Sequence, residues 1–135
     1  MKAIKVILER GSGDLWGRIE ELDFSFFTTG NTVDEVVSNL KMLVADFIEN
    51  EGADNPNWAN ISVDNLTFEV EYDLTAFFEL FSALKIGSVA EQAGINQSLM
   101  RQYASGIKHP STQQVKKIQG VIHELANSLL NVQLA

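Results

Sequence analysis

Five polar side chains between Asn96 and Gln102 are the strongest candidates for chemistry in this sequence. They carry amide, hydroxyl and guanidinium groups: Asn96, Gln97, Ser98, Arg101 and Gln102. Their spacing places them on the outward side of one helix. Groups of these types donate to and accept from the edges of base pairs in the major groove of DNA. The pattern therefore predicts base reading by hydrogen bonds, with no covalent reaction.

The residues around this polar row have the pattern of two short helices joined by a tight turn. Such a pair needs a small residue where the helices cross and a glycine that can adopt a left-handed conformation, and Ala90 and Gly94 supply them. Five apolar residues are expected to face inward: Val89, Ala93, Ile95, Met100 and Tyr103. Gly106 is expected to close the second helix. A purely structural helical pair would show the same small and apolar residues, and that alternative stays open.

Charge is divided unevenly along the chain, whose formal net charge is −8. Residues 1–79 hold five basic and sixteen acidic side chains, whereas residues 80–135 hold five basic and two acidic ones. Four lysines flank the polar row: Lys85, Lys108, Lys116 and Lys117. A locally positive end allows phosphate to approach. The split between the halves indicates two surfaces with different partners.

Several classes of function are disfavoured by what the chain lacks. It has no cysteine, which rules out disulfides and thiol nucleophiles. It has no apolar run long enough to span a membrane and no signal-like start, so we expect a soluble, cytoplasmic protein without a membrane partner. His109 and His123 show no ligand or triad spacing, so we expect no metal, no cofactor and no enzyme activity. Glu69, Glu71 and Asp73 alternate along one strand, which keeps a metal-dependent nuclease as a third possibility.

The first 72 residues show a β-β-β-α-β order. Alternating apolar residues predict four strands: 2–9, 15–22, 23–29 and 65–72. Thr32 and Glu35 form a capping box that starts a helix after the third strand. Its apolar stripe is Val33, Val36, Val37, Leu40, Leu43, Val44, Phe47 and Ile48. A polar loop is predicted at residues 51–60, and Trp16 and Trp58 are expected to pack.

Beyond residue 72 only helices are predicted. Asp73 is a candidate cap for the first, and Ser111 for a final helix that reaches about Asn131. The expected fold class is α+β, with a β-β-β-α-β domain of residues 1–72 and an all-helical helix-turn-helix domain of residues 73–135. The last apolar residues are a candidate dimer seam, or they complete the core of a single chain: Leu125, Leu129, Leu130, Val132 and Leu134.

Residues 75–130 resemble the Cro/C1-type (XRE) family of helix-turn-helix domains. The similar segment is IGSVAEQAGINQSLMRQYASG, residues 86–106, followed by IKHPS. The resemblance implies base contacts from Gln97, Ser98 and Gln102, with Asn96 and Arg101 beside them. The phosphate contacts expected with it are Lys85, Ser88, Lys108, His109 and Lys116. Leu99 stands where many members have a small polar residue, and it either touches a thymine methyl group or packs.

The first half resembles the HicB antitoxin family. The similar segments are IKVILERG, residues 4–11, and GNTVDEV, residues 30–36, which is similar to that family's G-x-T-x-E-E-A signature. The resemblance implies a partial ribonuclease-H-like domain that inhibits a small basic ribonuclease toxin, beside a DNA-binding domain that represses the shared operon. The family's proline- and glycine-containing segment after the second strand is absent, and ELDFSF, residues 21–26, stands there.

The sequence therefore predicts a sequence-specific DNA-binding transcriptional repressor that is also the antitoxin of a type II toxin–antitoxin system. One recognition helix covers about one half-site, so we expect a homodimer on a palindromic operator with half-sites ~34 Å apart. The alternative is a one-component transcriptional regulator. Its N-terminal domain would dimerise or sense a small ligand, with no toxin partner.

Overall fold

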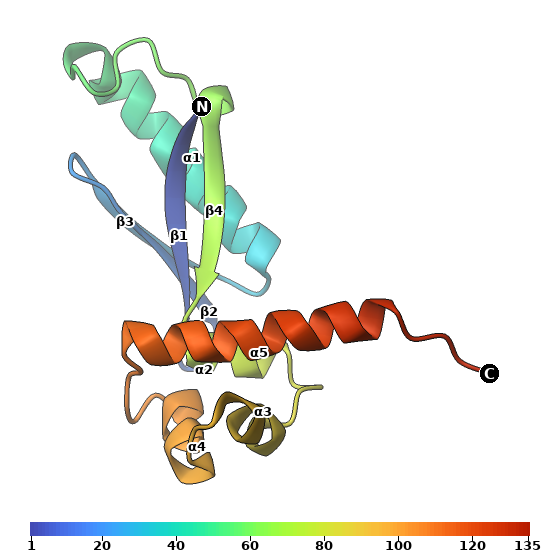
Figure 1. Ribbon diagram of the computed structural model, residues 1–135. Helices are drawn as coiled ribbons and strands as arrows, with labels where there is room; N and C mark the ends of the chain where they lie inside the picture. Colours follow the sequence, from blue (N-terminus) through green and yellow to red (C-terminus); the bar gives the residue numbers. More distant parts are fainter. The chain divides into compact units, whose positions relative to one another are not determined.

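The computed structural model describes residues 1–135, which form two compact units, Met1–Ala76 and Phe77–Ala135 (Figure 1). The first unit holds β1 (Lys2–Arg10), β2 (Leu15–Glu20), β3 (Ser25–Gly30), α1 (Val33–Glu51), short 3-10 turns at Gly52–Asp54 and Val63–Asn65, and β4 (Leu66–Tyr72). The helices α2 (Leu74–Leu80), α3 (Ile86–Ala93), α4 (Gln97–Ser105) and α5 (Thr112–Leu130) follow. The predicted α+β class, with β-β-β-α-β followed by helices, is confirmed.

The four strands form one sheet in the order β3-β2-β1-β4. β1 pairs antiparallel with β2 in the predicted hairpin, β2 pairs antiparallel with β3, and β4 lies parallel to β1. α1 covers one face of this sheet (Figure 1), where the apolar sides of strands and helix meet. The other face, which we call the open face, has no helix of this unit over it.

The start of α1 follows its predicted cap closely. The Thr32 hydroxyl accepts the Glu35 amide at 3.1 Å, and the Glu35 carboxylate accepts the Asn31 amide at 3.0 Å. The carboxylate thus reaches one residue further back than a standard capping box. Most of the predicted apolar stripe packs in the core, since Val36, Leu40, Val44 and Phe47 are buried and Val33 and Ile48 are partly buried against them. Leu43, predicted to face the core, is exposed, since it lies at the edge of the stripe.

A tryptophan holds the loop after α1 against the core. Trp58 is only 1% exposed and packs against Phe24 and Phe47, with ring centroids 5.2 and 5.8 Å away. Its indole N–H donates to the Asp23 carboxylate at 3.0 Å, and Lys2 lies over its ring. The expectation that Trp58 packs is confirmed. Trp16 was expected to pack as well, but it is 42% exposed on the open face.

The Asp23 carboxylate predicts a pH dependence of stability. A side-chain hydrogen bond from Asn55, with others from Asn57 and Trp58, holds the pKa of Asp23 below its ordinary value of 3.8. Because the folded pKa is the lower one, this group stabilises the fold above that pH and the contribution is lost as pH falls through the folded pKa. In urea unfolding followed from neutral pH to below about pH 4, Asp23→Asn should show a smaller decline than the unaltered chain. Asp64→Asn, which removes an exposed carboxylate elsewhere, is the control, and equal declines in all three proteins would contradict this prediction.

The first turn of α2 belongs to the sheet unit. Asp73 caps it as predicted, since its carboxylate accepts the Ala76 amide at 2.7 Å. Ala76 is fully buried and is part of the core beneath the sheet. The compact units accordingly divide after Ala76, four residues beyond the expected end of the first domain at Tyr72.

In the second unit, α3 packs against both α4 and α5. Ile118 and Val121 of α5 are buried, whereas the C-terminal part of the helix extends beyond α3 and α4 (Figure 1). Leu129 there is 60% exposed, and the apolar residues after it are exposed too. They do not complete the core of a single chain. No helix of the protein combines the length and the apolar character needed to cross a membrane.

Candidate nucleic-acid interface

The turn between α3 and α4 is built from the predicted glycine. Gly94 adopts the left-handed conformation with φ of 69°, which a side chain would strain. Its N–H donates to the Glu91 carbonyl at 3.2 Å, and the Ile95 N–H donates to the Ala90 carbonyl at 2.9 Å. This pair of bonds is a Schellman motif, and the buried Ile95 supplies its apolar contact. The direction in which α4 leaves the turn is thus fixed by backbone geometry and by one buried side chain.

Asn96 is the N-cap of α4. Its side-chain oxygen accepts the amides of Ser98 and Leu99 at 2.9 and 3.2 Å. This carbonyl satisfies helix amides that would otherwise lack partners. A base contact from Asn96 would therefore have to come from its amide nitrogen. Sequence reasoning placed Asn96 with the base-contacting residues, although asparagine directly before a helix is also a preferred cap.

α4 separates an inward face from an outward one as predicted. Met100 and Tyr103 are buried, while Leu99 is half-buried at the border. The outward side chains form what we call the recognition face: Gln97, Ser98, Arg101 and Gln102. The first three are exposed and Gln102 is half-buried. The row of side chains predicted from the sequence is therefore available to a ligand.

Gly87, in the first turn of α3, is a residue that sequence reasoning missed. A Cβ atom built on Gly87 would lie 3.2 Å from the side-chain oxygen of Gln97 and 3.4 Å from its carboxamide carbon. The first distance is shorter than an ordinary packing contact, so the absence of a side chain at Gly87 makes room for the end of the Gln97 side chain. A glycine in place of a good helix former was the available signal.

The end of α4 leads into the loop predicted to approach phosphate. Gly106 caps the helix with φ of 83°, as predicted. The Lys108 N–H donates to the Gln102 carbonyl at 3.2 Å, which ties this loop to the recognition face. Ser111 then caps α5 by accepting the Gln114 amide at 3.2 Å. The loop is therefore held at both ends by hydrogen bonds.

All five residues expected on phosphate are exposed: Lys85, Ser88, Lys108, His109 and Lys116. They come from the start of α3, from the loop after α4 and from the first turns of α5. Lys117 is exposed as well, although it was not among the expected contacts. None of the basic side chains of this unit forms an ion pair within the chain. Their charge is therefore not neutralised by carboxylates of the protein.

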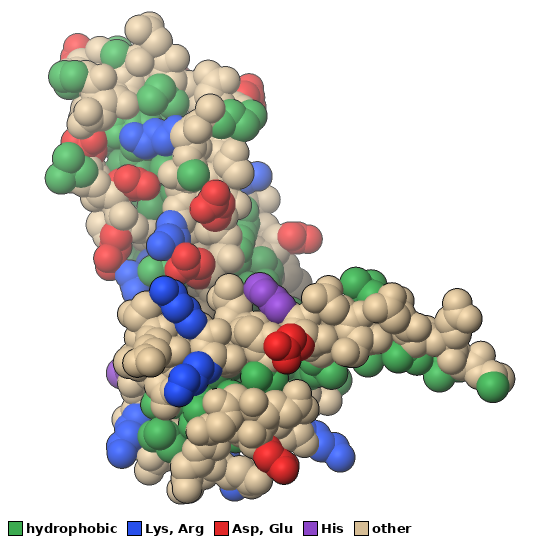
Figure 2. All heavy atoms as spheres, in the orientation of Figure 1, with side chains coloured by type: hydrophobic (Ala, Val, Ile, Leu, Met, Phe, Trp, Pro, Cys, Tyr) green, Lys and Arg blue, Asp and Glu red, His purple; other side chains and the backbone are tan.

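The two units differ in charge. Residues 77–135 hold five basic and three acidic side chains, whereas residues 1–76 hold five basic and fifteen acidic ones. Figure 2 shows carboxylates spread over the sheet unit and mainly lysine and arginine on the helical unit. The helical unit therefore has a formal net charge of +2 and the sheet unit one of −10.

The carboxylates considered for a metal site do not gather. Glu71 forms an ion pair with Lys5 at 3.1 Å, and the Asp73 carboxylate caps α2. No group of three or more histidine, aspartate or glutamate residues could hold a metal ion.

No protein-family model, no curated protein and no solved structure matches the chain. Among its described features, the recognition face and the unpaired cations around it bear most directly on function.

Proposed function

We propose that this protein is a cytoplasmic, sequence-specific DNA-binding repressor and the antitoxin of a small basic ribonuclease toxin. The observation that carries the DNA-binding part is the recognition face. Exposed amide, hydroxyl and guanidinium groups lie along α4, and the helix is oriented by a left-handed glycine turn and a side-chain cap.

The recognition face suits the major groove, which is wide enough for one helix and displays a distinct donor and acceptor pattern for each base pair. Arg101 is the side chain able to donate two hydrogen bonds to guanine. Gln97 and Gln102 are able to pair with adenine in the same two-bond manner. Because the side-chain oxygen of Asn96 accepts the capping hydrogen bonds, the first residue of the helix that reads a base is Gln97.

The exposed cations add affinity that does not depend on sequence. Each phosphate neutralised by lysine or arginine releases condensed counterions, so log affinity falls with log salt at about −0.9 per contact. With three or four contacts per protomer, a dimer should show a slope of roughly −5 to −7. A slope near zero on the selected operator would contradict phosphate binding by this unit.

The exposed end of α5 supports a homodimer. Leu125 and Leu129 lie one helical turn apart and form an apolar stripe on α5, and Val132 in the tail after the helix is exposed too. Two copies joined there would present two recognition faces, which a palindromic operator with half-sites ~34 Å apart would match.

Replacing Leu129 by glutamate tests this seam. Two like charges placed in a self-complementary apolar interface would be desolvated without partners. We expect Leu129→Glu to shift the chain toward monomer in sedimentation and to lower affinity for a two-half-site operator about tenfold or more. Ser128→Glu, which adds the same charge beside the stripe, is the matched control. A Leu129→Glu chain that remains dimeric would place the dimer contact elsewhere.

The antitoxin part of the proposal is supported by the acidic sheet unit, whose order of elements fits the HicB-like resemblance. Its charge suits a basic partner. The test is co-expression with the product of a neighbouring gene for a small basic protein. Co-purification together with relief of ribonuclease toxicity is expected. If no such gene neighbours this one, the one-component regulator is the better description.

Selection of bound sequences from random DNA duplexes tests the DNA-binding part most directly. The expected result is an enriched palindrome whose half-sites repeat after about one helical turn. Recovery of no enriched sequence, or equal retention of all duplexes, would overturn the proposal that α4 reads bases. The selection itself supplies the operator for the affinity measurements.

A further inference from the structure

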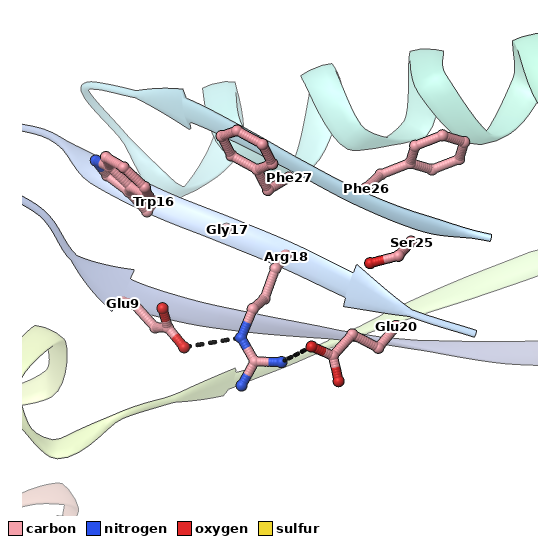
Figure 3. A pocket seen from close by; sticks show the side chains of 8 residues that line it. All are labelled: Glu9, Trp16, Gly17, Arg18, Glu20, Ser25, Phe26 and Phe27. Carbon is pink, nitrogen blue, oxygen red and sulfur yellow. Dashed lines mark hydrogen bonds and ion pairs between the residues drawn. The ribbon is translucent and has the colours of Figure 1, made fainter. Parts of the chain in front are cut away.

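Besides the recognition face, the open face of the sheet has an uncovered aromatic pair. Trp16 of β2 and Phe27 of β3 stack with ring centroids 5.9 Å apart and planes 20° from parallel. They are 42% and 67% exposed. They border a cavity of about 290 Å³ in which Arg18 also lies (Figure 3). Adjacent exposed aromatic rings on one sheet face are typical of surfaces that bind another molecule.

Arg18 and two carboxylates are among the side chains that line this cavity. The Arg18 guanidinium bridges the carboxylates of Glu9 and Glu20, at 2.8 and 2.7 Å (Figure 3). Each carboxylate keeps one oxygen that is not in these bonds. Arg18 thus fixes two acceptors beside the aromatic pair, and a cationic side chain entering the cavity would meet both carboxylate oxygens and ring faces.

The backbone of β3 is available beside the aromatic pair, because β3 is an edge strand. Just after β2, the Glu21 N–H donates to the Phe24 carbonyl at 2.9 Å. The backbone N–H and C=O of Phe24 therefore point toward β2 and away from the free edge. Alternation along an antiparallel strand then turns the N–H and C=O of Ser25 and Phe27 outward. Thr29 belongs to the same alternating set as Ser25 and Phe27. Its carbonyl accepts a hydrogen bond from the Asn39 side chain of α1 at 3.3 Å, so it also points away from β2.

We propose that β3 and the Trp16–Phe27 pair form a docking site for an extended, basic segment of a partner protein. The segment adds as a fifth strand to the edge of β3, and its lysine or arginine side chains reach across Phe27 toward Trp16 and Glu20. Main-chain bonds supply affinity and the alternating side chains supply selectivity. This inference rests on the part of the proposed function in which the acidic unit binds a basic partner. It adds which surface of that unit the partner contacts.

Charge argues for this occupant over a second copy of the chain. Two sheet units joined edge to edge would bring together fifteen acidic and only five basic side chains from each copy. Such like-charge contact is unfavourable, whereas a basic segment gains from the same field.

The test titrates the full-length, isotope-labelled protein at low salt with a short, blocked peptide of alternating lysine and valine. The matched peptide has glutamate in place of lysine. We expect the basic peptide to shift the amide resonances of residues 25–29 and the Trp16 indole, and the acidic peptide to leave them unchanged. Equal shifts with both peptides, no shifts with either, or shifts confined to α1 or to the helical unit would overturn the proposal.

Phe27→Ala locates the site, and its side chain is exposed enough for the fold to tolerate the change. The substitution should weaken binding of the basic peptide at least about tenfold. Met42→Ala removes an exposed apolar side chain from α1 and should leave binding unchanged. If sedimentation shows self-association that Phe27→Ala abolishes, the occupant is a second copy and the proposal fails. DNA affinity, measured on the same variants, reports separately on the proposed repressor function.

Discussion

Replacing Arg101 by alanine is expected to weaken binding to the selected operator by about 1–3 kcal/mol at each half-site. Arg101 is exposed near the middle of the recognition face, and no carboxylate of the chain pairs with it. In the proposed complex the guanidinium would supply two donors in a fixed geometry to one guanine, so its loss would remove discrimination at that base pair. Affinities of the variant for operator and for random duplex, measured at one salt concentration, give the result.

Lys85→Ala is the matched comparison, because Lys85 is exposed at the start of α3 and is expected on phosphate. The change should weaken binding to the operator and to random duplex by similar factors. It should also make the slope of log affinity against log salt shallower by about one unit per protomer. If Arg101→Ala lost the same factor of affinity for the operator and for random duplex, Arg101 would be a phosphate contact as well. Base reading would then belong to Gln97, Ser98 and Gln102.

Trp58→Ala is expected to cost about 3–5 kcal/mol of folding free energy, the range seen when a buried aromatic side chain is truncated. The ring fills a site between Phe24 and Phe47, and its N–H is the partner of Asp23. Truncation leaves a cavity and removes one of the bonds to that carboxylate. Urea unfolding followed by circular dichroism measures the loss without relying on the fluorophore that is removed.

Trp16→Phe provides the control for Trp58, since it changes the other tryptophan at an exposed position and keeps a ring against Phe27. Its cost should stay below about 1 kcal/mol. If Trp58→Ala cost no more than the control, the loop after α1 would not be anchored through its indole, and the aromatic cluster would contribute little to the sheet unit.

The order of elements follows from local patterns, but part of the packing does not. Alternation places the strands to within a few residues, because half-buried strands need it along their whole length. Pairing of β4 beside β1 is a contact across more than sixty residues, and no local pattern specifies it. The same holds for Trp58: its packing was expected, but its partner Phe24 lies far away in the chain.

Within the candidate site, the inward and outward faces of α4 were predictable from the spacing of its apolar residues. Spacing alone did not decide between two possible roles of Asn96. Asn96 suits both a base edge and a helix cap, and the structure uses its oxygen for the cap. The exposure of Leu43 has a similar origin, since periodicity gives the direction of an apolar face but not how much of it the partner sheet reaches.

The close approach between Gly87 and Gln97 has an evolutionary consequence. A change from glycine to alanine at position 87 would displace the Gln97 carboxamide by a few tenths of an ångström while touching no nucleotide. In the proposed DNA complex, the preferred operator sequence would then change through a position outside the contact surface. Compensating changes at positions 87 and 97 should therefore arise together among descendants of this gene.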